Sequence, residues 1–253
     1  MSKFKFLLTP KWILVTLICF GMLPAFQALS NWQWHRLSDR QVLNVQIQSQ
    51  IDKDPVSLSG ILIDGTESKS VPSDTQWQTV EMTGTWLQPE QVLVRKKSLE
   101  SNLGLWVVTP LRLTDGTVVM INRGWTAAAN SAIDSPVVAD VPIGEVEVLG
   151  RLRDVQERTS PAPTDLPEGQ VDRIVPIEIV SSEETLSNAY VEMTASRPES
   201  KTPEIRTLPE PEVTEGAHRS YALQWMFFAI MTVIGWIILV RNELKDQRLA
   251  KVG

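Results

Sequence analysis

The sequence predicts a membrane protein in which two transmembrane helices flank an extracytoplasmic α+β domain, mainly of antiparallel β-structure. Two apolar runs, Trp12–Leu29 and Tyr221–Val240, are each long enough as helices to cross a bilayer core, which is roughly 30 Å thick. Between them, short apolar or alternating runs bounded by turn residues are typical of strands. Basic residues gather at both chain ends, so the positive-inside rule places both termini in the cytoplasm.

These observations divide the chain into five segments. In order, they are a cytoplasmic tail (1–11), a transmembrane helix (12–30), an extracytoplasmic domain (31–217), a second transmembrane helix (218–240) and a second cytoplasmic tail (241–253). The domain lies in the periplasm or the intermembrane space and ends in a tether rich in Pro and Glu. From Asn31 to Ser220 the chain holds 17 Lys and Arg against 28 Asp and Glu, and this net charge of −11 opposes nucleic acid as a partner.

The first apolar run resembles a secretory signal as well as an anchor. Lysines precede it, and Ala28-x-Ser30 is a small-residue cleavage pattern. The length of the run and the aromatic and basic belt from Trp32 to Arg36 favour an uncleaved signal anchor. Because Pro24 removes a backbone donor, we expect it to kink this helix or to end its regular part.

The domain is expected to begin with a helix and to continue as strands. An apolar i, i+4 row predicts an amphipathic helix over 36–52. The predicted strands are 78–86, 91–98, 104–113, 117–123 and 146–153. A last helix and strand cover about 182–194. The Pro-, Glu-, Ser- and Thr-rich stretches 157–167 and 196–215 favour extended, solvated backbone, and the second predicts a stiff tether.

One hairpin is specified by its turn residues. Asp115-Gly116 separates two predicted strands, and a type I′ turn needs positive φ at both central residues. This pattern predicts Leu113 opposite Val118. Pro110 cannot donate to a ladder, so it indicates an edge or a bulge in the first arm.

Catalytic and metal-binding motifs are scarce in this sequence. The single cysteine, Cys19, lies in an apolar run, which excludes a disulfide framework and a Cys-based zinc site. The two histidines, His35 and His218, are too few for a conventional metalloenzyme. No phosphate-binding glycine loop, G-x-S-x-G or H-E-x-x-H motif occurs, and the carboxylates of an acidic surface nominate no acid/base pair. We therefore expect no enzymatic activity.

Two short motifs allow a structural and a functional interpretation. In Asn122-Arg123-Gly124-Trp125, a central strand finishes in a glycine bend above a packed tryptophan, or Arg123 and Trp125 belong to a surface that meets the membrane or a partner. In the same way, Trp32-Gln33-Trp34-His35-Arg36 is an interfacial belt or the first wall of a site at the bilayer surface.

His218, just before the second apolar run, is an interfacial side chain or a ligand. In the first turn of a helix, the positive end of the dipole favours the neutral imidazole, which is the form that binds metal. One face of that helix then holds His218, Ala222, Trp225 and Ala229, with Tyr221 and Phe228 beside it. Such a face suits a flat, apolar ring.

Three patches of sequence anchor both apolar runs and the predicted hairpin. They are Leu29-Ser30-Asn31-Trp32-Gln33 with Arg36 and Arg40, the stretch from Gly104 to Trp125, and His218-Arg219-Ser220-Tyr221-Ala222-Leu223-Gln224-Trp225. Together they resemble the Surfeit locus protein one family of cytochrome c oxidase assembly factors. Its patterns read L-G-x-W-Q-x-x-R-x-x-x-K, then G-x-x-V-x-T-P-L with D-G and N-R-G-W, then H-x-x-Y-A-x-Q-W. Ser30 and Arg40 depart from this pattern, and the segments 55–74 and 132–215 match it only loosely.

The resemblance implies a multi-pass protein of the bacterial inner membrane that helps to mature subunit I of haem-copper oxidases. Its implied partners are subunit I, haem a synthase and the lipid bilayer. In bacterial members of the family, a role in binding haem a is associated with the histidine that matches His218. The resemblance therefore implies transiently bound haem a, with His218 as the axial ligand of the iron. Tyr221 and Trp225 are then expected as walls of its pocket, with Trp32 and Arg36 as further cofactor-binding residues.

Two alternatives stay open. The first is a cofactor-free membrane scaffold that stabilises an oxidase assembly intermediate through the acidic domain and the two spans. The second keeps the haem but adds a ligand, because His35 and His218 flank the spans on the same side and could hold one iron from opposite faces.

Overall fold

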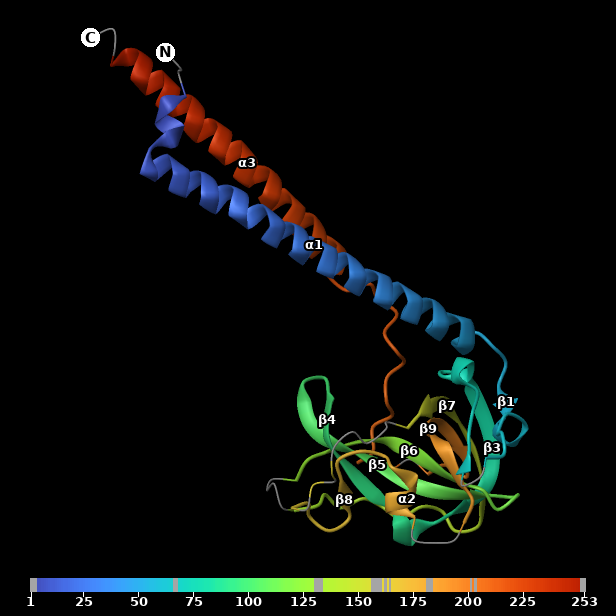
Figure 1. Ribbon diagram of the computed structural model, residues 1–253. Helices are drawn as coiled ribbons and strands as arrows, with labels where there is room; N and C mark the ends of the chain where they lie inside the picture. The colour runs from blue at the N-terminus through green and yellow to red at the C-terminus, as the bar shows by residue number, and fades with distance from the viewer. Residues whose placement is uncertain are drawn as a thin grey trace. The chain divides into compact units, whose positions relative to one another are not determined.

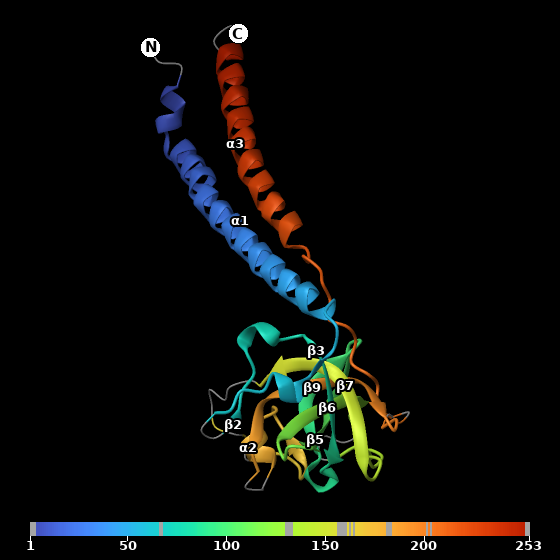
Figure 2. The same ribbon diagram turned by 90° about the vertical axis from the view of Figure 1, so that its right-hand side faces the viewer.

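The computed structural model describes residues 4–65, 68–129, 134–155, 161, 163, 165–180, 184–200, 202 and 204–250. The chain forms two compact units, one comprising Met1–Val45 with Val213–Gly253 and the other Gln46–Glu212. The first unit is helical and the second is rich in β-structure (Figures 1 and 2).

The helical unit is built from α1 (Pro10–Ile51) and α3 (His218–Leu249), which lie side by side and antiparallel (Figures 1 and 2). Both are long and apolar enough to cross a membrane, and only 6% of each apolar window is buried. A core helix of a soluble protein would be mostly covered, whereas these helices turn their apolar side chains outward. Near the ends of the chain, Phe6 and Trp12 pack against Val240. Both basic tails therefore leave the same end of the pair.

Pro24 lies inside α1, which continues without a break to Ile51. The expectation that Pro24 ends the regular part of the helix is therefore wrong, and the amphipathic helix predicted from residue 36 is the continuation of α1. Packing on both sides of the proline explains this. Phe20 lies edge-on to Trp236, and Phe26 stacks on Trp225, so α3 supports α1 before and after the missing hydrogen bond.

The β-unit is a closed barrel, a point that the sequence left open. The strands that form it are β3 (Thr79–Trp86), β4 (Val92–Leu99), β5 (Asn102–Leu113), β6 (Val118–Ala127), β7 (Glu145–Asp154) and β9 (Leu186–Arg197), and the short strands β1 (Val56–Ser57), β2 (Ser68–Lys69) and β8 (Gln170–Val171) pair with them. The ring runs β3–β7–β9–β6–β5 and closes through pairing of the end of β5 with β3, while β4 pairs with the first part of β5. Only the β6–β9 contact within this ring is parallel.

The strands of the barrel differ in how their side chains are buried: β3 alternates between buried and more exposed residues, whereas β5, β6 and β9 hold longer buried runs. On β3 the pattern places Val80, Met82 and Trp86 inside, where they meet the inward residues of the other strands. β6 is buried on both faces, because a second cluster around Met120 packs against α2 (Pro176–Ile179) and its neighbours. All the strands predicted from the sequence are confirmed, with ends shifted by a few residues. The last helix lies earlier than expected, and residues 181–183 fall outside the described part of the chain.

The hairpin between β5 and β6 has a different turn from the predicted one. The amide of Leu113 bonds the carbonyl of Thr117 at 2.8 Å, and Gly116 bonds Leu113 at 3.0 Å, so three residues form the loop. Gly116 has a φ of 84°, whereas Asp115 does not adopt positive φ and accepts a hydrogen bond from the amide of Thr117. Arg112, not Leu113, therefore lies opposite Val118. A side-chain cap at Asp115 has replaced the type I′ turn.

Pro110 confirms the expectation of a local edge. On its outer side β5 pairs with β4 as far as Val108 and with β3 from Leu111 onward. Pro110 lies where β5 passes from one neighbour to the other, so no ladder needs the missing amide there. Its carbonyl still accepts a bond from Leu87 at 2.9 Å.

Candidate functional site

His218 is the first residue of α3 and is fixed by a side chain from α1. Its Nδ1 lies 2.8 Å from Oε1 of Gln33, and Gln33 itself is buried. Because an amide oxygen only accepts hydrogen bonds, Nδ1 is the donor in this contact, and in the neutral imidazole Nε2 then carries the lone pair. Histidines that bind metal are held in this way by an outer partner that fixes the tautomer and the orientation of the ring.

The contact between Gln33 and His218 belongs to a tightly packed seam. Ser30 donates a hydrogen bond to the carbonyl of Ala222 at 3.1 Å, and both residues are buried. Small residues at such positions let two helix backbones approach closely. One turn further, Phe26 and Trp225 stack with their ring centroids 6.1 Å apart. The row expected to face a flat ring is thus occupied, at Ala222 and Trp225, by packing against α1.

The other predicted site residues lie outside this seam. Tyr221 is 49% exposed and Trp32 is 52% exposed. The guanidinium of Arg36 lies over Trp32, 5.8 Å from its ring centroid. The structure therefore forms two separate contacts, His218 with Gln33 and Trp32 with Arg36.

His35 lies on the opposite face of α1 from Gln33. Two residues along an α-helix correspond to a rotation of about 200°. Since Gln33 faces α3, His35 points away from it and is exposed. This geometry disfavours the arrangement in which both histidines hold one iron within a single chain.

Gln33 is the residue that the sequence alone did not reveal as a partner of His218. It belongs to the Trp32-Gln33 pair of the first patch, and His218 opens the third patch. Both residues of the pair therefore stood in motifs that the sequence singled out. Only the packing of α1 against α3 shows that these two motifs meet.

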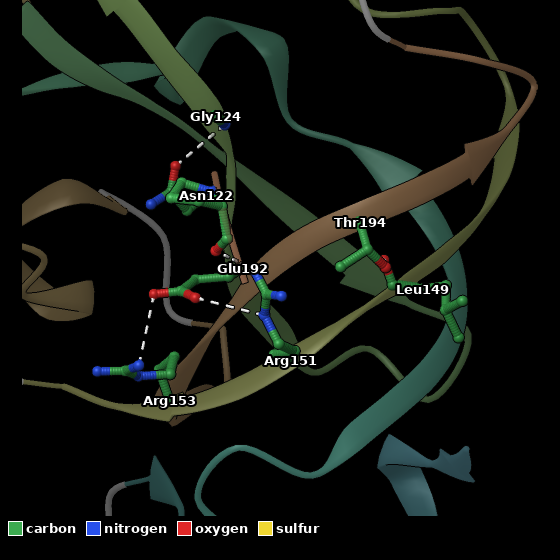
Figure 3. A network of polar contacts seen from close by, with 8 residues as sticks. Asn122, Gly124, Leu149, Arg151, Arg153, Glu192 and Thr194 are labelled. Carbon is green, nitrogen blue, oxygen red and sulfur yellow. Dashed lines mark hydrogen bonds and ion pairs between the residues drawn. The ribbon is translucent and has the colours of Figure 1, made fainter. Parts of the chain in front are cut away.

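The β-unit contains a buried charged cluster of its own (Figure 3). The sheet register sets Glu192 of β9 between Asn122 of β6 and Arg151 of β7. The Glu192 carboxylate lies 3.7 Å from Arg151 Nε and 3.7 Å from Arg153 Nη1. Arg153 also lies over the ring of Trp77, 3.4 Å from its centroid. These ion pairs join β7 to β9.

Tyr190 lies beside this cluster and is also buried. Burial, with the negative charge of Glu192, raises the pKa of Tyr190 to about 12. The phenol is therefore neutral at physiological pH, and it packs near Trp106 with ring centroids 6.5 Å apart. Among the described residues, no group of three His, Cys, Asp or Glu could hold a metal ion.

Arg123 and Trp125 of the Asn122-Arg123-Gly124-Trp125 motif are 0% and 4% exposed. The interpretation that they form a surface for the membrane or a partner is therefore wrong. Arg123 lies in a β-bulge. Asn122 pairs with Val108 and Gly124 with Val107, which leaves Arg123 as the extra residue. Burial lowers the pKa of Arg123 to about 10, against an ordinary value of 12.5.

A cavity of about 630 Å³ is lined by residues of β3, β7 and β9 and by the segment around β1. The carboxylates of Glu81 and Glu147, the guanidinium of Arg197 and several hydroxyl groups contribute to its lining. Its charges are mixed, and none of the predicted haem-binding residues belongs to it.

Comparison with known proteins gives a consistent result. A model described as the SURF1 family matches residues 20–230, a range that contains Gln33, His218 and the whole barrel. An uncharacterized SURF1-like protein of Mycobacterium tuberculosis (strain H37Rv) is 27% identical over 258 residues, which cover 100% of this chain and 92% of the relative. A SURF1-like protein of Rickettsia felis is 24% identical over 91% of this chain and 97% of its own length. A SURF1-like protein of Dictyostelium discoideum is 29% identical over 40% of this chain and 38% of the relative.

Proposed function

Because the chain belongs to the SURF1 family, we propose that it is a non-enzymatic assembly factor for haem-copper cytochrome c oxidase. In this proposal it holds haem a transiently and passes it to subunit I, with haem a synthase as the source of the haem. The family is one of assembly factors and not a known enzyme class, which supports the first part.

The observation that carries haem binding is the hydrogen bond between Gln33 and His218. It orients an imidazole whose Nε2 is free to bind iron, and it draws on both helices of the pair. Histidine is a common axial ligand of haem iron. The donor set at this end of the helical unit therefore suits a haem held by one protein ligand.

The packing of the seam also restricts where the haem would lie. Ala222 is buried against α1, so the macrocycle would lie beside the seam and not within it. Tyr221, about one turn after His218 and half exposed, would form one wall, and the outer edge of Trp225 would form another. Trp32 and Arg36 would contribute on the α1 side. A haem covered on few sides by its carrier is one that a partner can receive.

The proposed location is the bacterial inner membrane, with both termini in the cytoplasm. Two helices able to cross a membrane support it, as do the basic tails at one end of the pair. The Gln33–His218 contact would then lie toward the extracytoplasmic side of the bilayer.

The visible spectrum of the purified protein tests this proposal. The full chain, His218→Ala and His35→Ala would be purified from cells that make haem a. We expect stoichiometric haem in the full chain and in His35→Ala, and its loss in His218→Ala, because the two histidines lie on different helices and only His218 is held for ligation.

A folded His218→Ala protein with unchanged haem content would remove the ligand assignment. Colourless wild-type protein that still co-purifies with subunit I would favour the cofactor-free scaffold instead. Loss of haem in His35→Ala alone would transfer the assignment to the other histidine.

A further inference from the structure

The segment that leads from β9 to α3 is bound to the barrel, although its composition predicts a solvated tether. Among its described residues, Ser200 and Ile205 are buried. Ile205 packs with Leu93, Leu105 and Val107 in a small apolar cluster. A Pro- and Glu-rich stretch that buries such residues must be held by specific contacts, because its composition alone does not favour packing.

The first contact comes from Arg123, the extra residue of the bulge in β6. Its Nη2 donates to the carbonyl of Ser200 at 2.9 Å, and its Nη1 donates to Oε1 of Gln91 at 2.8 Å. A buried guanidinium is costly unless hydrogen bonds satisfy it. One of these bonds is made to the backbone of the segment itself, so undocking of the segment would deprive the buried Nη2 of this partner.

Gly124 and Trp125 form the second contact. Trp125 and Arg206 exchange two backbone hydrogen bonds, each 2.8 Å long. Gly124 has a φ of 141°, and a Cβ there would lie 2.4 Å from the carbonyl oxygen of Arg206 and 2.9 Å from Ile205. Only glycine lets the segment approach β6 so closely.

The third contact comes from Arg151 on β7. Its Nη2 donates to the carbonyl of Pro209 at 3.0 Å. Beyond this point Glu215 accepts a bond from Gln41 of α1 at 2.7 Å, within the helical unit. Residues 210–214 therefore form the connection between the contact at Pro209 and the contact at Glu215. Fully extended, they reach about 17 Å, whereas the whole stretch 198–214 would reach about 58 Å.

From these contacts we infer that Arg123, Gly124, Trp125 and Arg151 are positioning residues, which clamp the segment 198–209 to the barrel and shorten the free connection to the helix that carries His218. The Asn122-Arg123-Gly124-Trp125 motif then acts by holding the backbone of another segment. The functional part of this inference rests on the proposed function, whereas the clamp itself does not.

Hydrogen exchange of the full-length protein in detergent tests the clamp. Gly124→Ala places a methyl group against Arg206, and we expect exchange of the Arg206 amide to rise about ten-fold or more. Gly144→Ala is the matched control, because Gly144 also has positive φ, 98°, but nothing lies within 4 Å of its added Cβ. Amides of β3 and β7 should keep their protection in both variants.

Arg206→Pro provides a second variant that leaves the barrel sequence intact. It removes the amide that donates to the carbonyl of Trp125, and we expect the same opening of the segment. Unchanged exchange of the segment in Arg206→Pro and in folded Gly124→Ala would overturn the clamp.

A linker insertion tests the positioning role. Ten Gly and Ser residues inserted between Val213 and Thr214 would lengthen the connection without altering the clamp. In cells that lack their own copy, we expect this insertion and Gly124→Ala to lower oxidase activity several-fold, with Gly144→Ala unaffected. A defect in Gly124→Ala with a harmless insertion, or no defect in either, would overturn the positioning role. If wild-type protein does not restore the oxidase, the proposed function fails, and the exchange measurement still decides the clamp.

Discussion

At the scale of single residues, the protein places polar groups where they are fixed by one or two well-defined partners. Gln33 and His218 are the clearest pair. Their hydrogen bond holds both side chains in one orientation between α1 and α3. Arg123 is another, since both of its bonds go to neutral carbonyl oxygens and not to a carboxylate. These residues are the ones whose replacement should have measurable and separable effects.

Under the proposed function, Gln33→Leu should weaken haem binding by His218 without abolishing it. Loss of an outer partner of a metal-binding histidine typically lowers affinity by about 10–100-fold. The control is Gln27→Leu on the same helix, because Gln27 is exposed and donates to Asn31, one turn along α1, at 2.9 Å. Haem titration followed by absorbance would measure both. Equal affinities in the two variants would show that Gln33 does not support the ligand.

Tyr190 should make the barrel sensitive to alkaline pH. Its pKa is about 12 in the folded protein, because of burial and then the charge of Glu192, against 10.0 ordinarily. The folded state therefore binds the proton more tightly, so this stability is complete below pH 10 and is lost as pH rises toward 12. Relative to Tyr190→Phe, the free energy of unfolding should fall by roughly 2–3 kcal/mol across that range. Urea unfolding at several pH values checks this, and parallel pH profiles of the two proteins would contradict it.

At the scale of the elements, the seam between α1 and α3 depends on small side chains. Ala222→Leu should force the helices apart at Ser30, because overpacking a close contact costs about 1–3 kcal/mol. Ala28→Leu is the matched control, since Ala28 is exposed on α1. Thermal unfolding followed by circular dichroism should show a lower melting temperature for Ala222→Leu alone. Equal melting temperatures would mean that the seam can relax around the larger side chain.

The strands could be predicted from the sequence, whereas one turn, the full length of α1 and the docking of the segment after β9 could not. Strand positions followed from short apolar runs bounded by turn residues: the runs alternate in β3 and β7 and are continuous in β6, which is buried on both faces. The turn at Asp115 was missed because a local side-chain bond competes with the backbone preference on which the prediction relied. Continuation of α1 through Pro24 was missed because the supporting contacts come from α3, more than two hundred residues away in the chain. Similarly, the Pro-rich segment after β9 had the composition of a solvated tether, whereas its docking depends on Arg123, Gly124 and Trp125.

At the scale of the whole molecule, closure of the barrel is the feature that no local pattern announced. It depends on pairing of β3 with β5, which places Gly84 opposite Leu113. A Cβ at Gly84 would lie 2.3 Å from the carbonyl oxygen of Arg112. The family patterns did indicate the two-helix architecture and His218, yet they gave no hint that the strands return to form a ring.

Gly84→Ala should therefore weaken the closure. We expect a loss of about 1–3 kcal/mol in the free energy of unfolding, because the backbone of β5 cannot move away without opening the ring. Gly60→Ala serves as the control, since its added Cβ meets nothing within 4 Å. Chemical denaturation followed by tryptophan fluorescence would measure both variants. Similar stabilities would indicate that β3 and β5 can separate without cost.

The bond between Gln33 and His218 has a consequence for biosynthesis, because 185 positions separate the two residues. During translation Gln33 emerges early, whereas His218 leaves the ribosome only after the entire barrel sequence has been made. A nascent or prematurely terminated chain thus carries Gln33 without His218, its partner in the pair. Completion of the second helix is then the event that joins Gln33 to His218, so the proposed haem site would form only once the whole chain has been made.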